Sequence, residues 1–320
     1  MLASQQPLNQ VQQIVVTENH AGQRVDNFLF TLLRGVPKSK LYRIIRKGEL
    51  RVNKKRVDVS YRLVEGDTVR IPPLRYEEKE VPVKSSPGSR TLKNIEDSIV
   101  YEDDHLLIIN KPSGIAVHGG SGISWGLIEA LRQLRPYSPF LELVHRLDRD
   151  TSGCVMIAKK RSMLLHLHEC LKTGNIQKNY FALVAGAWRG GKMVEAPLHK
   201  YVLPSGERMV KVVDDGKFAQ TAVKILESYP QATLLQVSPL TGRTHQIRVH
   251  CAFMGHPILG DQKYGDSEKN HQAKAMGFTR LFLHAHQLTI ELPNKSERLT
   301  VTCPMPSECQ QFLAKLKSQT

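Results

Sequence analysis

The chain has 320 residues, 41% of them hydrophobic, which is enough for two domains with ordinary cores. Its 45 Lys and Arg residues outnumber 30 Asp and Glu residues, and the net charge of +15 favours a polyanionic partner. No apolar run approaches the roughly 20 residues that span a bilayer, and no secretory signal pattern opens the sequence. We therefore expect a soluble, cytoplasmic protein with no membrane partner.

The cysteines and histidines follow no metal-binding pattern. The five cysteines are scattered, odd in number and without a C-x-x-C pair, so we expect buried free thiols in a reducing compartment. The 13 histidines include no H-E-x-x-H motif and no other pair at ligand spacing with suitable partners. The glycine run at 119–122 lacks the G-x-x-x-x-G-K-[ST] spacing of a nucleotide-binding loop. We expect no metal and no cofactor.

Composition and hydrophobic periodicity divide the chain into four parts. These are an N-terminal extension with one strand at 13–16, a small α/β domain, a linker and a larger second domain, with the bounds 1–23, 24–73, 74–95 and 96–320. The linker is rich in Pro, Ser and mixed charge and poor in apolar residues. Its length would let the first domain move relative to the second.

The small domain is predicted to contain two helices and two short strands. Apolar positions at helical spacing begin after Arg24 and stop at Gly35, and a second stripe lies between Ser39, a candidate N-cap, and Gly48. Short strands are expected at 50–52 and 69–71, around turn residues.

Basic residues dominate this domain. Between Arg24 and Arg75 there are 14 basic and 5 acidic residues. A solvated helix face usually mixes both signs, whereas a face of one sign can neutralise phosphates and release their counterions. The candidate RNA-binding residues on or near the second helix are Lys38, Lys40, Arg43, Arg46, Lys47, Lys54, Lys55 and Arg56.

The second domain shows many strands and few helices. Strands are expected at 99–101, 106–110, 154–158, 176–184, 219–226, 233–238, 281–292 and 299–303, and helices at 125–134, 162–171 and 245–254. Thr244 is the candidate N-cap of the helix at 245–254, and the capping-box spacing after Ser307 predicts a last helix. This pattern indicates an α+β domain around a mixed or antiparallel sheet.

The stretch 144–153, V-H-R-L-D-R-D-T-S-G, places alternating bases and acids between two apolar runs. Charges that meet near a core shift each other's pKa and are common at reactive sites, although structural ion pairs do the same. On the residues alone, a charged turn with internal ion pairs and a reactive site are equally good interpretations.

Four motifs resemble those of the RluA-type RNA pseudouridine synthases. They are H-R-L-D-x-x-T-S-G at 145–153, Q-K-N-Y at 177–180, T-G-R-T-H-Q-I-R-V-H at 241–250 and L-F-L-H-A at 281–285, in the family's order and at similar intervals. The sequences R-V-D-N-F-L, S-K-L-Y-R-I-I-R-K-G and V-N-K-K-R-V in the small domain resemble the S4 RNA-binding domain. The resemblance implies a pseudouridine synthase fold and an isomerase that acts on RNA.

The resemblance also implies which residues carry the chemistry. Asp148 matches the catalytic aspartate, which acts beside the anomeric carbon of the sugar as nucleophile or base. Asp150 is the competing carboxylate, which we expect to be a surface or ion-pair group. Arg248 matches the arginine that pairs with the aspartate, and Arg243 is its rival, which could contact RNA instead.

Three further residues are assigned to the pocket by the same resemblance. Tyr180 matches an active-site tyrosine that could stack on a flipped uracil or take part in proton transfer, although a core tyrosine is the ordinary alternative. Leu283 would line the substrate pocket by packing. Arg146 would occupy the space that the flipped nucleotide leaves. His145 and His284 are expected to be hydrogen-bonded structural groups.

The favoured hypothesis is therefore a monomeric enzyme that isomerises uridines in 23S ribosomal RNA or in a large-subunit assembly intermediate. The alternatives are a transfer RNA pseudouridine synthase, a non-catalytic ribosome-assembly factor that binds RNA through its basic domain, and a carbohydrate hydrolase that uses Asp148 and Asp150. The basic domain counts against the hydrolase.

Overall fold

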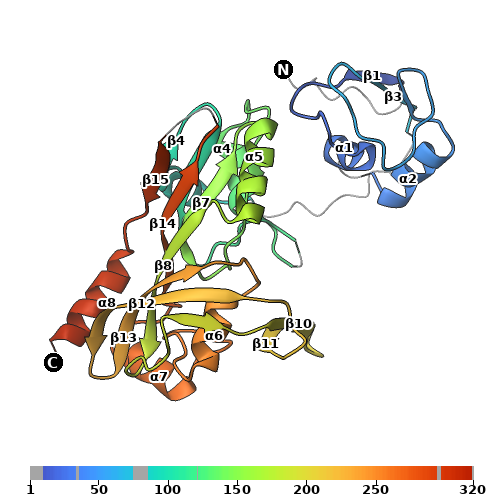
Figure 1. The fold of residues 1–320 in the computed structure, drawn as a ribbon. Helices are drawn as coiled ribbons and strands as arrows, with labels where there is room; N and C mark the ends of the chain where they lie inside the picture. The colour runs from blue at the N-terminus through green and yellow to red at the C-terminus, as the bar shows by residue number, and fades with distance from the viewer. Residues whose placement is uncertain (1–9, 34–35, 75–85, 121, 294–296, 319–320) are drawn as a thin grey trace.

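The computed structural model describes residues 10–33, 36–74, 86–120, 122–293 and 297–318, and it shows two bodies (Figure 1). The described residues up to 74 form the smaller body and the described residues from 86 onward the larger one, and each body has its own hydrophobic core. Residues 75–85 of the expected linker and Gly35, the expected end of the first helix, lie outside the described residues.

The smaller body packs two helices against a three-stranded antiparallel sheet. Its elements are β1 (Gln12–Val15), α1 (Val25–Leu32), α2 (Lys38–Arg46), β2 (Arg51–Val52) and β3 (Thr68–Ile71), with the strand order β1-β3-β2. As predicted, α2 buries Leu41, Ile44 and Ile45 and leaves most of its basic side chains exposed.

The structure changes two predictions for this body. β1 pairs with β3 along its whole length, from Gln12 opposite Ile71 to Val15 opposite Thr68, so this segment belongs to the domain and not to an extension. Ser39 does not cap α2. The helix begins at Lys38 with Pro37 as its N-cap, because the fixed φ of proline already leads the chain into the helix.

A helix that was not predicted, α3 (Ser89–Glu96), occupies the end of the expected linker. Ile95 is fully buried, and Leu92 packs against the core of the larger body. Glu96 forms an ion pair with Arg135, which follows α4 (Leu127–Leu134). The second domain therefore starts at about Ser89 and not at residue 96.

One ten-stranded sheet forms the centre of the larger body. Its strands are β4 (Ile99–Glu102), β5 (Leu106–Lys111), β6 (Glu142–Leu143), β7 (Ser152–Ala158), β8 (Gln177–Ala185), β9 (Met193–Glu195), β12 (Gln220–Tyr229), β13 (Ala232–Pro239), β14 (Leu283–Glu291) and β15 (Arg298–Thr302). The order is β4-β5-β7-β14-β8-β13-β12-β9, with β15 on β14 and β6 on β7. Only β7 and β14 pair in parallel, so the sheet is mixed and the predicted α+β class is confirmed.

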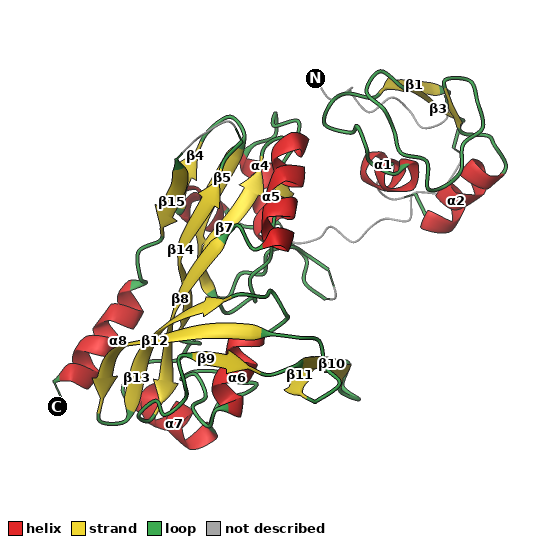
Figure 2. Ribbon diagram, viewed as in Figure 1, coloured by secondary structure: helices red, strands yellow, loops and turns green. Residues whose placement is uncertain are grey.

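Helices flank the two halves of this sheet (Figure 2). α4 and α5 (Arg161–Thr173) lie at the half that holds β4, β5 and β7, whereas α6 (Gln246–Phe253) and α7 (Ser267–Ala275) lie at the other half. α8 (Ser307–Lys317) follows the last strand, and a hairpin of β10 (Leu198–Val202) and β11 (Arg208–Val212) packs near α6. No helix within the described ranges is long and apolar enough to cross a bilayer.

Helix starts in this body were the least accurate predictions. Thr244 does not cap α6; the N-cap is His245, in a left-handed conformation. α8 has Pro306 as its N-cap, so Ser307 does not form the expected capping box. α7 was not predicted because its side chains are polar all round and only Ala273 is buried, which leaves no apolar stripe to detect.

The centre of the sheet requires a glycine at position 153. β7 and β14 meet at Ser152 opposite His284 and Gly153 opposite Ala285. A Cβ on Gly153 would lie 2.2 Å from the carbonyl oxygen of Ala285, and its φ of 109° also disfavours any other residue. The T-S-G motif therefore allows the two strands to approach each other immediately after the loop that carries Asp148.

Candidate active site

Asp148 lies in the loop between β6 and β7, and Lys111 fixes the backbone of this loop. The Lys111 side chain is fully buried, and its Nζ donates to the carbonyls of Pro112 (2.9 Å), Ile115 (2.8 Å) and Arg149 (3.0 Å). Burial lowers the pKa of Lys111 to about 7. Three carbonyls converging on one buried ammonium hold the residue after Asp148 in place.

The two motif histidines that were predicted to be hydrogen-bonded, His145 and His284, both have partners within the protein. His284 Nδ1 lies 2.9 Å from Ser152 Oγ, and its Nε2 lies 3.2 Å from the Cys303 carbonyl. His145 Nε2 accepts a hydrogen bond from the Met156 N–H at 3.1 Å. Burial lowers the pKa of His145 and of His284 to about 4, so both rings are neutral at physiological pH.

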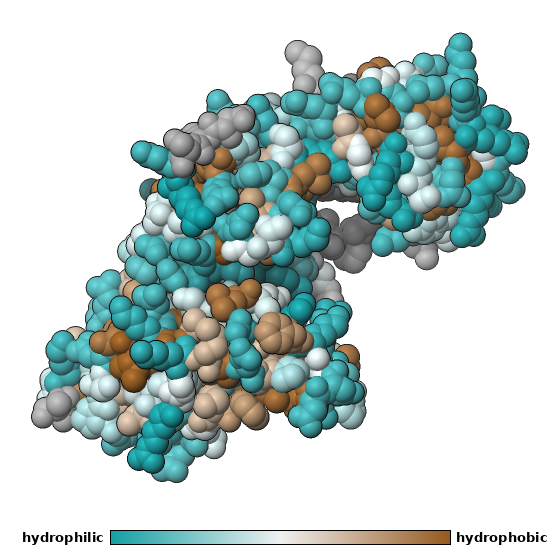
Figure 3. Space-filling view, viewed as in Figure 1, coloured by the Kyte–Doolittle hydropathy of each residue, from teal (hydrophilic) through white to brown (hydrophobic). Residues whose placement is uncertain are grey.

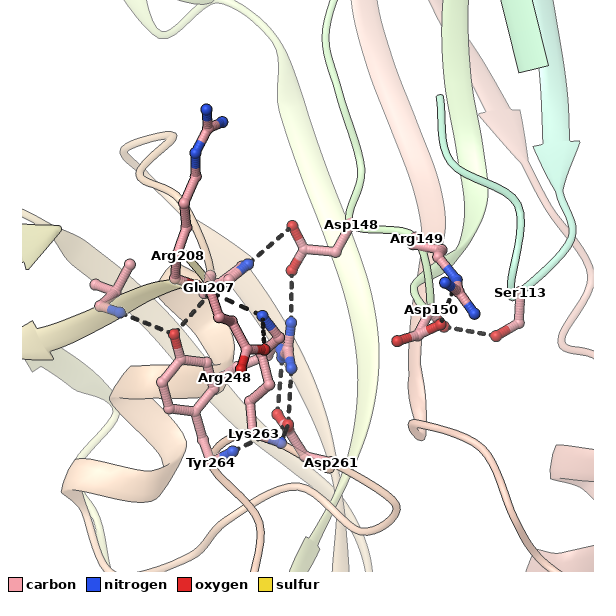
Figure 4. A network of polar contacts seen from close by, with 12 residues as sticks. Ser113, Asp148, Arg149, Asp150, Glu207, Arg208, Arg248, Asp261, Lys263 and Tyr264 are labelled. Carbon is pink, nitrogen blue, oxygen red and sulfur yellow. Dashed lines mark hydrogen bonds and ion pairs between the residues drawn. The ribbon is translucent and has the colours of Figure 1, made fainter. Parts of the chain in front are cut away.

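Asp148 forms an ion pair with Arg248, which α6 carries (Figure 4). Arg248 Nη1 donates to Asp148 Oδ2 at 3.0 Å, and Arg248 Nε and Nη2 donate to the two carboxylate oxygens of Asp261, each at 2.7 Å. The side chains of Arg248 and Asp261 are 6% and 1% exposed, whereas that of Asp148 is 20% exposed. The buried guanidinium of Arg248 thus connects the buried carboxylate of Asp261 to the carboxylate of Asp148, which a ligand can reach.

The charges of this network support one another. Burial disfavours ionisation of Asp261, but hydrogen bonds and Coulombic attraction from Arg248 outweigh it and lower the pKa of Asp261. Burial alone would lower the pKa of Arg248, and its two carboxylate partners raise it instead. The guanidinium is therefore always charged, and Asp261 balances that charge independently of Asp148.

Tyr180 and Leu283 come from neighbouring strands, β8 and β14. Tyr180 lies opposite Ala285, and Leu283 lies opposite Ala182. The Tyr180 side chain is only 8% exposed, and burial, with the charge of Asp148, raises the pKa of its hydroxyl well above the usual value. This hydroxyl stays protonated at neutral pH.

A cavity of about 950 Å³ brings the predicted site residues together. Its lining includes Arg146, Asp148, Tyr180, Arg243, Arg248 and Leu283. Lys172 and Lys178 add further positive charge to the wall, and Asp148 is the only acidic residue among the lining residues that the structure describes. The cavity is therefore suited to an anionic ligand that is brought to a single carboxylate.

The structure separates the competing candidates. Arg248 pairs with Asp148, whereas Arg243 is exposed at the cavity wall and donates from Nε to the Phe218 carbonyl at 3.0 Å. Asp150 is 55% exposed, lies 3.7 Å from Arg149 Nε, does not line the cavity and is separate from the contacts of Asp148 with Arg248 (Figure 4). The two carboxylates therefore do not face one ligand, which argues against the hydrolase.

Sequence reasoning missed three residues of this site: Asp261, His245 and Tyr264. His245 Nε2 lies 3.7 Å from Asp148 Oδ1, and its Nδ1 lies 2.7 Å from the Tyr264 hydroxyl. One signal in the sequence pointed to Asp261: the expected buried Arg248 needs acidic partners to balance its charge. It could not identify Asp261 among 30 acidic residues, because only the folded chain brings that residue to Arg248.

The described residues contain no group of His, Cys, Asp or Glu that could hold a metal ion.

The basic residues of the smaller body form a second charged surface. Lys38, Arg43, Arg46, Lys47, Lys54, Lys55 and Arg56 are exposed, and none of them forms an ion pair within the described residues; Lys40 is half-buried. Asn53 and Lys54 both have positive φ in a tight turn between Val52 and Lys55. Hydrophilic side chains cover the α2 side of this body in Figure 3.

The fold and the cavity define a two-domain protein with a buried carboxylate–guanidinium site, and comparison with known proteins gives its family. The family described as RNA pseudouridylate synthase matches residues 105–253, and the S4 domain matches residues 23–69. The chain is 52% identical over 311 residues to ribosomal large subunit pseudouridine synthase C of Pasteurella multocida (strain Pm70), covering 97% of this chain and 95% of the relative. The chain therefore belongs to the RNA pseudouridylate synthase family.

Two further comparisons agree with this result. The protein of the same name from Escherichia coli (strain K12) is 53% identical over 308 residues, which cover 95% of this chain and 96% of the relative. The solved structure of Human RNA Pseudouridylate Synthase Domain Containing 4 is similar with a TM-score of 0.59 and 29% identity, covering 71% of this chain and 95% of that chain. The predicted family, fold and S4 domain are confirmed.

Proposed function

We propose that this protein converts specific uridines of large-subunit (23S) ribosomal RNA to pseudouridine. One observation carries the proposal: the accessible carboxylate of Asp148 stands in a cationic cavity, paired with a buried guanidinium and accompanied by Tyr180 and Leu283. Both relatives described above are more than half identical over almost the whole chain and are named for the large ribosomal subunit, which supports ribosomal RNA over transfer RNA.

The reaction needs little besides a placed carboxylate. The bond from N1 of uracil to C1′ of the ribose breaks, and its electron pair leaves with the base. After the base turns, C5 bonds to C1′, the C5 proton is lost and N1 gains a proton, so no redox partner or phosphoryl donor enters. Asp148 acts on the sugar during this exchange, as nucleophile at C1′ or as base.

The other cavity residues receive and hold the target nucleotide. A uridine within paired RNA must leave its stack to reach Asp148, and the ring of Tyr180 and the side chain of Leu283 offer it an apolar wall. Because the Tyr180 hydroxyl stays protonated, it can donate a hydrogen bond to the base. Arg146, exposed at the cavity, fills the space that the nucleotide leaves.

The S4 domain supplies affinity for structured RNA. Its exposed cations neutralise phosphates, since double-stranded RNA shows few base edges to side chains. With ribosomal RNA as substrate, either mature or in a large-subunit assembly intermediate, the enzyme works in the cytoplasm. We propose that the enzyme is a monomer, and sedimentation of the free protein checks that state.

Replacing Asp148 tests the chemical assignment. Asp148→Ala should lower pseudouridine formation by about 10⁴-fold or more, since the group that acts on the sugar is gone, while RNA affinity is kept. The matched control is Asp150→Ala, two residues away and exposed, which should keep full activity. An active Asp148→Ala protein would contradict the assignment.

Pseudouridine mapping tests the substrate. Total RNA from cells with and without the gene is treated with carbodiimide and sequenced for reverse-transcription stops. Loss of discrete sites in large-subunit ribosomal RNA is expected. Loss confined to transfer RNA would keep the chemistry and replace the substrate. No loss, together with impaired ribosome assembly, would favour a binding factor.

A further inference from the structure

His245 has an unusual backbone conformation beside the candidate catalytic carboxylate. Its φ and ψ are 52° and 18°, and only Asn53 and Lys54 share a positive φ among the non-glycine residues that the structure describes. A left-handed conformation at such a residue costs free energy and persists where surrounding contacts impose it, often at functional sites. The strain therefore points to a reason for placing this imidazole here.

Hydrogen bonds of the Gln246 side chain fix the turn that contains His245. Its buried side-chain amide accepts from the Arg243 N–H (3.0 Å) and the Thr241 hydroxyl (2.7 Å), and donates to the Gln220 carbonyl and the Thr221 hydroxyl, each at 2.9 Å. All four hydrogen-bonding positions of the amide are used. The turn before α6 is thus fixed from both sides, and His245 is directed toward Asp148.

Tyr264 determines which nitrogen of His245 carries the proton. The Tyr264 hydroxyl accepts a hydrogen bond from the Val210 N–H of β11 at 3.0 Å, and His245 Nδ1, at 2.7 Å, is its other partner within the described chain. The hydroxyl has one proton to donate, and Nδ1 is the acceptor that its described partners offer, so we assign this proton to the hydrogen bond with Nδ1. The neutral imidazole then carries its own proton on Nε2, which faces Asp148.

The two oxygens of Asp148 have different neighbours. Oδ2 accepts from Arg248 at 3.0 Å, whereas Oδ1 lies 3.7 Å from His245 Nε2, slightly beyond hydrogen-bond distance. Hydrogen bonds in active sites are often long in the free protein and tighten when the substrate is bound. Oδ1 therefore has a donor poised beside it.

We propose that His245 is a positioning residue for Asp148: a neutral imidazole, held by Tyr264 as the Nε2–H tautomer, steadies Oδ1 while Arg248 holds Oδ2. This inference rests on the proposed function. It gives Asp148 a donor on each oxygen and directs the carboxylate at the sugar. Tyr264 contacts both residues that hold Asp148: its hydroxyl lies beside His245, and the centre of its ring lies 5.1 Å from the guanidinium carbon of Arg248.

The surrounding charges favour the neutral form of His245. Burial lowers the pKa of His245, Asp148 and Asp261 raise it, and Arg248 and Lys263 lower it, with a net downward shift. Glu207 also belongs to this environment, but it is paired with Lys263 at 2.6 Å. As pH falls through the lowered pKa, the ring gains a proton on Nδ1 and loses the hydrogen bond that Tyr264 donates. The rate should then fall.

The test compares single-turnover rates of the full-length protein on its RNA substrate across pH. Tyr264→Phe removes the donor that favours neutral His245, so the pKa of His245 rises and the acidic limb of the rate profile moves to higher pH. The rate at the optimum should fall about 10-fold, with RNA affinity unchanged. The matched control is Tyr201→Phe. Tyr201 lies on β10, which pairs with the β11 strand that contacts Tyr264, and its replacement should leave the pH profile unchanged.

His245 variants complete the test. His245→Ala should lower the rate by about 10²-fold. His245→Gln keeps a side-chain N–H near Oδ1 but cannot titrate, so it should restore part of the rate and lose the acidic limb that His245 causes. An unchanged pH profile in Tyr264→Phe, or equal rates for the Gln and Ala variants, would overturn the inference. Failure of the proposed function is distinguishable, because wild-type protein would then form no pseudouridine.

Discussion

At the scale of single residues, the buried guanidinium of Arg248 explains how an accessible carboxylate keeps a fixed position. Arg248 donates to Asp148 through one nitrogen and to Asp261 through two. A buried guanidinium needs a counter-charge, and Asp261 supplies one that does not depend on Asp148. The second carboxylate shares the charge and leaves Asp148 available.

Replacement of Asp261 should therefore affect both stability and catalysis. Asp261→Asn keeps the shape but leaves a buried guanidinium short of a counter-charge, so the free energy of unfolding should fall by about 3 kcal/mol. Asp148 should be drawn toward Arg248, which should lower the rate by about 10²-fold. Urea unfolding and single-turnover rates measure the two effects; wild-type stability with a wild-type rate would show that Asp148 alone balances Arg248.

The same substitution has a pH signature. The pKa of Asp261 is lower in the folded than in the unfolded chain, so its stabilising contribution is present above about pH 4, the unfolded value. That contribution is lost as pH falls through the folded value. Asp261→Asn should therefore lose less stability on acidification than the wild type does.

The residues found from the sequence were those that stand inside motifs. Asp148, Arg248, Tyr180 and Leu283 were assigned by position within four segments, and one cavity contains them all. His245 stands in such a motif too, but its role depends on a contact with Tyr264, 19 residues away. A contact between side chains is a property of the folded backbone, and no periodicity in the sequence encodes it.

At the scale of elements, the parallel contact between β7 and β14 constrains the packing at the centre of the sheet. The carbonyl of Ala285 occupies the space that a side chain at position 153 would need. β7 begins at this contact, with Ser152, and directly follows the loop that carries Asp148, so a shift of β7 would also move the carboxylate.

A single methyl group at position 153 should therefore be costly. Gly153→Ala combines a steric clash with an unfavourable φ, and should lower the free energy of unfolding by about 3 kcal/mol or more. Gly88→Ala is the matched control, since no atom lies within 4 Å of its added Cβ; its effect should stay within about 0.5 kcal/mol. Equal stabilities in urea unfolding would contradict this account.

Elements with a strong pattern were predicted well, and their ends were not. The buried strands β5 and β7 and the amphipathic helix α2 follow from their apolar residues. The start of α6 was placed wrongly because a glutamine side chain fixes the preceding turn from four directions. α3 was missed because the Pro and Ser residues around it suggested a linker, although Ile95 is fully buried.

At the scale of the whole molecule, two charged surfaces divide the work of RNA recognition. In the function that we propose, the cavity of the larger domain accepts one nucleotide. The S4 domain presents exposed cations, such as Lys38, Arg43 and Lys55, that form no ion pairs within the described residues. Arg161, at the start of α5, donates to the Ala21 carbonyl and thereby links the two bodies.

The exposed basic residues of the S4 domain should control the affinity for RNA without altering the chemical step. In Lys55→Ala/Arg56→Ala, the slope of log affinity against log salt should decrease by about two, one for each lost phosphate contact. The single-turnover rate at saturating protein should not change. Lys224→Ala, an exposed lysine of β12, is the control and should keep the wild-type slope. An unchanged slope in the double variant would remove this surface from RNA binding.

The parallel pairing at the centre of the sheet also orders events during protein synthesis. Ser152 and His284, which meet there, are separated by 132 positions in the chain. The S4 domain, by contrast, draws its core from the first 74 residues. A nascent chain can therefore fold its RNA-binding module long before residues 283–285 emerge from the ribosome. Until they do, the growing polypeptide can hold RNA but has no completed cavity in which to modify it.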